Sequence, residues 1–246
     1  MRTNVFDTVF AVCDQTKAGA TILHGTAFTL GMGVFMTAAH VVEELEDSDA
    51  PHLRRLSGKG MTQALPIRAS SRLPDIDVGI LHVDIDLPPV PMADSHEFQR
   101  KDVWTEGFAF GLDLVTKTFA SRYLKGHVVS TRKYNNWAEF DLSRTGVHDR
   151  EVFVHELSFP APKGQSGAPL FVDDEDGYSR CIGMIIGNSR SAVDTVSQSE
   201  VIEDGAVKEV IEYHDFLYLG QAISSASLLK WAIEPTITAA STQSKS

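Results

Sequence analysis

Short apolar runs alternate with turn-forming residues along most of the chain. The runs are rich in Val, Ile, Phe and Thr, and Gly, Pro, Asp and Asn separate them, which is typical of antiparallel strands. The pattern therefore predicts an all-β fold. The predicted strands are Val9–Cys13, Thr26–Leu30, Val34–Thr37, Val78–Val83, Val103–Phe108, Gly126–Ser130, Glu151–Phe159, Pro169–Val172, Cys181–Ile186 and Phe216–Ile223.

Helical periodicity occurs in two places. Ala38–Glu46 predicts a short helix, and Ser224–Ile233 predicts a closing helix with apolar positions at Ala226, Leu229 and Trp231. Neither is long enough to form a helical layer, so both are expected to decorate the strands.

A proline-rich segment divides the strands into two comparable sets. Leu87–Glu97 contains three prolines and interrupts any regular element. We therefore expect an N-terminal domain over 1–98, a C-terminal domain over 99–235, and a frayed Ser- and Thr-rich tail over 236–246.

Composition limits the choice of partner and compartment. The 246 residues carry a formal charge of -11, which disfavours nucleic acid and anionic membranes as partners. The only cysteines, Cys13 and Cys181, form no Cys-x-x-Cys pair, so neither a disulfide framework nor a cysteine zinc site is expected. No signal peptide and no membrane-length apolar stretch is recognised, which predicts a soluble, cytoplasmic protein.

One segment has the chemistry of a nucleophilic serine. Acyl transfer to a serine requires a hydroxyl, a base that takes its proton, a buried carboxylate that orients the base, and N–H donors for the oxyanion. Gly164-Gln165-Ser166-Gly167-Ala168-Pro169 places Ser166 in a glycine-flanked turn. The backbone N–H groups of Gly164 and Ser166 are the candidate oxyanion donors.

Three segments together resemble a known family. Thr37-Ala38-Ala39-His40, Asp77-Val78-Gly79-Ile80-Leu81 and the Ser166 segment are similar to the signature segments of trypsin-like, chymotrypsin-fold serine peptidases, in the same order. The resemblance implies a triad of His40, Asp77 and Ser166. It also implies two six-stranded antiparallel β-barrels with the site between them, a protein or peptide substrate, and no cofactor or metal.

Weaker similarities point to the bacterial HtrA-like branch of the family. They lie in Gly107–Gly111, where Ala109 replaces a proline, in Gly126–Ser130, and in Gly220–Ile223 before a helix. The regulatory peptide-binding domain of HtrA proteins has no counterpart in the sequence. We therefore expect restraint by narrow substrate choice or by a regulatory protein partner.

Two positions depart from the secreted trypsins. Gln165 replaces the aspartate that pairs with a newly cleaved N-terminus, so zymogen activation of that kind is not expected. Pro160 replaces the aspartate that captures a basic P1 side chain. By the same resemblance the S1 walls come from Ile186, Gly187, Asn188 and Gly220, and predict a small or medium apolar P1 residue.

Simpler interpretations apply to each of these residues. An isolated histidine or a Gly-Ser-Gly turn usually has no catalytic role, and Asp75 competes with Asp77 as the carboxylate. The remaining histidines lack metal-ligand spacing. The acidic run at Glu43–Asp47 lacks the alternation and turn glycine of a calcium loop, which favours a solvated helix end.

Two other functions compete with a peptidase. An α/β-hydrolase esterase is disfavoured because Pro169 and an apolar strand follow Ser166 where that fold needs a helix, and because Ala168 replaces the last glycine of Gly-x-Ser-x-Gly. A catalytically silent binding or scaffold module with a peptidase fold remains the second hypothesis.

Overall fold

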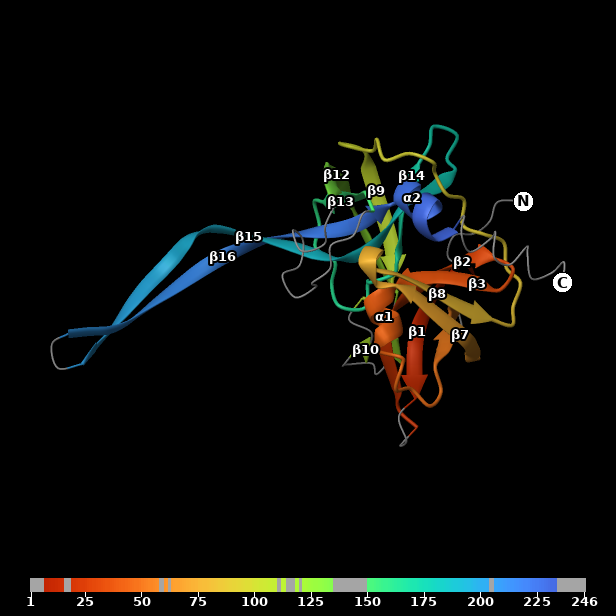
Figure 1. The fold of residues 1–246 in the computed structure, drawn as a ribbon, viewed down its shortest axis with the longest axis horizontal. Helices are drawn as coiled ribbons and strands as arrows, with labels where there is room; N and C mark the ends of the chain where they lie inside the picture. Colours follow the sequence, from red (N-terminus) through yellow and green to blue (C-terminus); the bar gives the residue numbers. More distant parts are fainter. Residues whose placement is uncertain are drawn as a thin grey trace.

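The chain forms two closed six-stranded barrels joined by one extended crossing segment (Figure 1). The computed structural model describes residues 7–15, 19–57, 60–61, 63–109, 112–113, 118–119, 121–134, 150–203 and 206–233. Every strand pair in both barrels is antiparallel. The predicted fold class is therefore confirmed.

The first barrel has the strand order β1-β2-β3-β8-β7-β4. Its centre is aromatic: Phe10 and Phe35 meet edge to face with ring centroids 5.2 Å apart, and Phe28 is fully buried beside them. The strands are β1 (Val9–Gln15), β2 (Thr21–Gly31), β3 (Val34–Ala38), β4 (His52–Arg54), β7 (Leu65–Leu73) and β8 (Val78–Val83).

The second barrel has the strand order β12-β13-β16-β15-β14-β9. Trp104 stacks on Phe171 at 4.5 Å, and the Trp104 indole N–H donates to Asp173 Oδ1 at 2.9 Å. The strands are β9 (Asp102–Gly107), β12 (Arg122–Tyr134), β13 (Val152–Leu157), β14 (Pro169–Asp173), β15 (Ser179–Glu203) and β16 (Ala206–Ser224). Small two-stranded ladders join β5 (Leu56–Ser57) to β6 (Gly60–Met61) and β10 (Leu112–Asp113) to β11 (Thr118–Phe119).

The segment between β8 and β9 contacts both barrels. Val90 N–H donates to Thr29 O in the first barrel, while Pro91 O and Ala93 N–H bond to the backbone of Cys181 in the second. The proline-rich stretch is thus held by main-chain bonds to both barrels, all of them within Val90–Ala93.

Short helices cover the barrel ends. They are α1 (Ala39–Glu43), η2 (Pro74–Ile76), α2 (Ser225–Leu228) and the single π turn η4 (Leu229–Ile233). Ser224 caps α2 by accepting from Ser227 N–H at 3.3 Å, and Trp231 Nε1 donates to Glu151 O at 2.9 Å. The closing helix therefore starts and ends where the sequence predicts. None of the helices among the described residues has the length and apolarity to cross a membrane.

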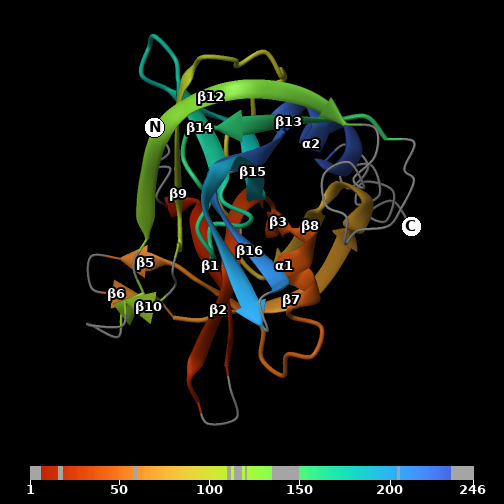
Figure 2. The ribbon, with the colours of Figure 1, turned by 90° about the vertical axis from the view of Figure 1, so that its left-hand side faces the viewer.

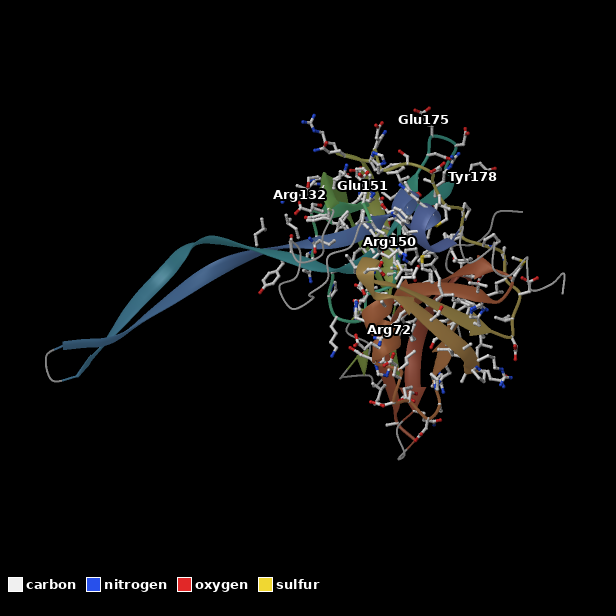
Figure 3. All side chains as sticks on the ribbon, in the orientation of Figure 1. Arg72, Arg132, Arg150, Glu151, Glu175 and Tyr178 are labelled. Carbon is white, nitrogen blue, oxygen red and sulfur yellow. The ribbon has the colours of Figure 1, made fainter. Side chains whose placement is uncertain are left out.

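Two arginines link elements near the barrel ends (Figure 3). Arg72 of β7 pairs with Glu43 at 3.2 Å and with Glu46 at 3.0 Å. Arg150 pairs with Asp75 at 3.1 Å and lies over the Trp231 ring at 5.6 Å. The first contact holds α1 against β7, and the second joins the first barrel to the closing helix.

The sequence prediction missed two barrel strands, the four short strands of the two-stranded ladders, and most of the arm formed by β15 and β16. β4 and β7 were not predicted, because β7 is largely exposed and carries Arg and Ser rather than an apolar alternation. Only the inner ends of β15 and β16 were predicted. The two strands continue past the barrel as a long two-stranded arm, which projects away from both barrels (Figures 1 and 2).

Candidate active site

His40 and Asp77 are held together by their main chains and their side chains. His40 Nδ1 lies 3.0 Å from Asp77 Oδ2 and 3.1 Å from Oδ1, and His40 N–H also donates to Oδ1 at 3.1 Å. Ala39 N–H donates to Asp77 O. The Asp77 side chain is 2% exposed and the His40 side chain 27%. Because a carboxylate only accepts, Nδ1 carries the proton, and the lone pair of Nε2 is available as a base.

Asp75, the competing carboxylate, faces elsewhere. Its side chain is paired with Arg150, away from His40. Asp77 itself has a positive φ of 50°, a conformation that aspartate tolerates better than most residues, at the point where η2 ends and β8 begins. This turn directs its carboxylate at the first turn of α1.

Ser166 lies in a turn that only glycine can flank. Gly164 has φ +91° and Gly167 has φ +84°, and a Cβ on Gly167 would lie 2.0 Å from Thr26 O. Side chains at either position would therefore strain the backbone, and at Gly167 they would also clash with the first barrel.

Thr26 of β2 clamps this turn across the barrel interface. Its N–H donates to Ser166 O at 2.8 Å, and its hydroxyl donates to Gly164 O at 2.8 Å while accepting from Phe108 N–H at 3.0 Å. Thr37 Oγ1 donates in turn to Thr26 O at 2.7 Å. The sequence analysis missed Thr26, since a threonine in a β-strand is ordinary and only the other barrel gives it this role.

The clamp leaves two N–H groups available. Gly164 O is bonded to Thr26 and Gln165 N–H to Pro162 O at 3.0 Å, so the peptide group between residues 164 and 165 is held at both of its polar ends. Within the described ranges, the N–H groups of Gly164 and Ser166 have no acceptor. Two unpaired N–H groups beside a serine hydroxyl are the arrangement that an oxyanion requires.

Ser166 and the helix that carries His40 meet at Gly25. A Cβ built on Gly25 would lie 2.6 Å from Val41 Cγ2 and 2.9 Å from Ser166 O, so residues 41 and 166 flank the same position. No hydrogen bond joins Ser166 Oγ to His40 Nε2 in the part of the chain described here. Such bonds are often long without substrate and tighten in the Michaelis complex.

A family model extends over all three segments. The model described as trypsin-like peptidase domain matches residues 25–184, which include His40, Asp77 and Ser166. The chain belongs to the trypsin-like peptidase domain family. A comparison with curated proteins gives no significant match.

Solved structures share the fold of this trypsin-like peptidase domain at low sequence identity. The inactive form of the Rv3671c protease of M. tuberculosis matches with TM-score 0.59 and 17% identity, covering 94% of this chain and 89% of that one. Its active form matches with TM-score 0.56 and 17% identity, over 92% and 79%. The MamO protease domain of Magnetospirillum magneticum, in its apo form, matches with TM-score 0.58 and 13% identity, over 92% and 96%.

Gln165 occupies a buried position under the Ser166 turn of the peptidase domain. Its side chain is fully buried, and Nε2 donates to Thr105 Oγ1 at 3.1 Å, which donates to Pro169 O at 2.7 Å. Since the Thr105 proton goes to a carbonyl, the group of Gln165 that faces Thr105 must be its NH₂. The turn is therefore supported from below by a neutral hydrogen bond rather than by an ion pair.

The residues predicted for the S1 walls lie on neighbouring segments. Asn188 bonds to Ala161 in both directions: Oδ1 accepts from Ala161 N–H at 2.6 Å, and Nδ2 donates to Ala161 O at 2.8 Å. Asn188 pairs in register with Gly220, whose N–H donates to Phe159 O at 2.8 Å. The structure thus gathers segment 159–161, the 186–188 part of β15 and Gly220 at one place, with Pro160 exposed and Ile186 buried.

The acidic run beside His40 is already paired with cationic groups or histidine. Glu43 and Glu46 bind Arg72, and Glu44 Oε2 lies 2.9 Å from His24 Nδ1. Among the described residues no group of His, Cys, Asp and Glu side chains is arranged to hold a metal ion. Burial raises the pKa of the Cys13 and Cys181 thiols to about 12, so both are inert, unpaired thiols. Phe110 and Gly111, which belong to the segment that resembles the HtrA-like branch, and the tail 236–246 lie outside the described residues.

Proposed function

We propose that this chain is a serine endopeptidase that hydrolyses peptide bonds through an acyl-enzyme on Ser166. The observation that carries the proposal is the clamped turn: it presents the Ser166 hydroxyl and two unpaired N–H groups beside a histidine whose proton-bearing nitrogen is fixed on a buried carboxylate.

Each residue has one task in this reaction. His40 Nε2 takes the Ser166 proton as Oγ attacks the scissile carbonyl, and the carbonyl oxygen becomes an oxyanion that accepts from Gly164 N–H and Ser166 N–H. His40 then gives the proton to the leaving amine, and the C–N bond breaks. Water then attacks the acyl-enzyme carbonyl while His40 takes its proton. His40 returns a proton to Ser166 Oγ as the ester bond breaks, and the acid product leaves. Asp77 keeps Nδ1 protonated and stabilises the imidazolium.

The pocket residues support a preference for small or medium apolar P1 side chains. Pro160 places no carboxylate where a basic side chain would need one, and Ile186, Gly187, Asn188 and Gly220 supply apolar and neutral walls. Each added or missing methylene should change discrimination by only about 1–3 kcal/mol. Cleavage of a peptide library restricted to Arg or Lys at P1 would contradict this preference.

A catalytically silent scaffold is the alternative, and the unmade bond between Ser166 Oγ and His40 Nε2 is the observation that favours it. Labelling with a serine-directed fluorophosphonate separates the two. We expect the wild type to be labelled and Ser166→Ala not to be, with His40→Ala slowed by at least about 10³-fold. Lys125→Ala, at an exposed position of β12, serves as a matched control for surface substitution. Absence of labelling in the folded wild type under all conditions would support the scaffold.

A further inference from the structure

β2 carries one extra residue where it passes the two catalytic segments. Val12 of β1 pairs with Gly25 and Cys13 pairs with Leu23, so His24 has no counterpart across the ladder. A β-bulge of this kind turns the side chains around it in new directions and is frequent beside active sites. The bulge therefore decides what this part of β2 can contact.

Both neighbours of His24 contact the turn that carries the nucleophile. Leu23 Cδ2 lies 3.1 Å from a Cβ built on Gly164, and Ser166 O lies 2.9 Å from a Cβ built on Gly25. β2 is therefore in close contact with the nucleophile turn on each side of the bulge.

His24 itself contacts the end of the helix that carries His40. Its Nδ1 lies 2.9 Å from Glu44 Oε2, and Glu44 N–H donates to His40 O at 3.2 Å. Since a carboxylate only accepts, Nδ1 of His24 is the donor. A Cβ on Gly25 would lie 2.6 Å from Val41 Cγ2, one residue after His40. The bulge thus contacts α1 at two points, as it does the nucleophile turn.

Packing alone gives no reason for a histidine in this bulge. The His24 side chain is 11% exposed, and its buried Nε2 has no hydrogen-bond partner among the residues that the structure describes. A buried ring nitrogen without a partner opposes folding, and the bulge leaves part of the ladder unpaired. A role at the neighbouring site accounts for a residue that stability does not favour.

A second set of ion pairs anchors the same helix end from another strand. Arg72 binds Glu43 and Glu46 from β7, which lies between β8 and β4 in the first barrel (Figure 3). β2 lies elsewhere in the barrel order, between β1 and β3. Arg72 therefore ties α1 to its own barrel, whereas His24 ties it to the strand that also contacts the nucleophile turn.

Resting on the proposed function, we propose that His24 is a positioning residue of the peptidase, which acts through Glu44 to set how closely α1 brings His40 to Ser166. β2 is then the common support of both catalytic segments: Thr26 fixes the serine turn, and His24 fixes the helix. Among the described atoms, Ser166 Oγ and His40 Nε2 make no hydrogen bond, so their approach depends on such supports. A displacement of about 1 Å can reduce a catalytic rate by on the order of 10²-fold.

Two substitutions of His24 separate the hydrogen bond from the bulk of the ring. The asparagine amide can place an N–H donor near the position of Nδ1, whereas leucine fills the space and donates nothing. With one peptide that has an apolar P1 residue, we expect His24→Leu to lower kcat at least about tenfold and to leave KM within about twofold. His24→Asn should keep kcat within about threefold of the wild type.

Glu44→Ala removes the same bond from its half-exposed partner, and it keeps the test valid if His24→Leu does not fold. It should lower kcat as much as His24→Leu does. The double variant should be no slower than either single variant, because one interaction is lost in all three. Arg72→Gln is the matched control: it loosens α1 from β7 and should leave kcat within about twofold of the wild type.

Hydrogen exchange reports on the helix independently of turnover. Glu44 N–H, which donates to His40 O, should exchange faster in His24→Leu than in the wild type. Thr26 N–H, which donates to Ser166 O, should exchange at the same rate in both proteins.

Unchanged kcat in both His24→Leu and Glu44→Ala would overturn the proposal. An equal loss of kcat in Arg72→Gln, or a loss confined to KM, would overturn it as well. Fluorophosphonate labelling of the wild type reports separately on Ser166. If the wild type is not labelled, the peptidase proposal fails, and the exchange of Glu44 N–H still decides whether His24 holds α1. The two failures are thus distinguishable.

Discussion

At the scale of single residues, the site depends on side chains from both barrels whose partners no motif reveals. Thr26 supplies the hydroxyl that orients Gly164, and Gln165 supports the Ser166 turn through Thr105. His40, Asp77 and Ser166 could be proposed from their segments because their neighbours are distinctive. Thr26 could not, because its role depends on a partner 138 residues away in sequence.

Thr26→Val tests the clamp. Valine keeps the shape but removes the hydroxyl, so Gly164 O loses its donor and Phe108 N–H loses its acceptor. We expect kcat to fall by at least about tenfold as the Ser166 turn that carries the two N–H donors is held less firmly, and the free energy of unfolding to fall by about 1–3 kcal/mol. Peptide hydrolysis and urea unfolding measure the two effects. Thr26→Ser retains the hydroxyl and should keep most of the rate; an unchanged kcat in Thr26→Val would show that the clamp is not needed.

At the scale of elements, most strands that face a barrel core were predictable, whereas the three-residue β4 and the largely exposed β7 were not. β8 was predicted with its observed bounds, Val78–Val83, because both of its faces are largely buried. β7 is mostly exposed and was missed. The arm was missed for a related reason: outside the barrel no core selects an apolar face, so its residues follow no clear alternation.

The closing helix offers a test at this scale. Ser224 is fully buried, and its hydroxyl caps α2 and donates to Ser227 Oγ at 3.1 Å. Ser224→Ala should lower the free energy of unfolding by about 1 kcal/mol, since the first turn loses its acceptor. Ser224→Thr, which keeps the hydroxyl, is the matched control. Identical urea midpoints for Ser224→Ala and the wild type would mean that the cap contributes nothing.

At the scale of the whole molecule, one buried histidine couples stability to pH. Burial lowers the pKa of His155 to about 4 from its ordinary 6.5, despite a bond to Ile182 O at 3.2 Å. That carbonyl can only accept, so Nε2 carries the proton and Nδ1 accepts from Thr131 Oγ1. The folded chain therefore holds a neutral imidazole under conditions in which the unfolded chain becomes charged.

Because burial lowers the pKa of His155, the folded chain should lose stability as the pH falls. Between pH 6.5 and about 4 the unfolded state binds a proton that the folded state excludes, so the stability present above pH 6.5 is lost as the pH falls. His155 should account for about 3 kcal/mol of that loss. The free energy of unfolding in urea, measured for the wild type and for His155→Gln across this pH range, separates the contribution of His155 from that of the carboxylates. Parallel pH profiles for the two proteins would contradict it.

The sequence alone determined the fold family and the residues with the chemistry. Apolar runs separated by turn residues indicate strands because local propensity and burial act over a few positions. The three segments around His40, Asp77 and Ser166 can be recognised because the residues next to each of them in the sequence are distinctive. Only the tertiary structure decided which groups meet. The Thr26 clamp, the pairing of Asp75 with Arg150 rather than His40, and the bond between His24 and Glu44 all depend on contacts between distant segments. The folded backbone brings those segments together, and no local pattern encodes their distances.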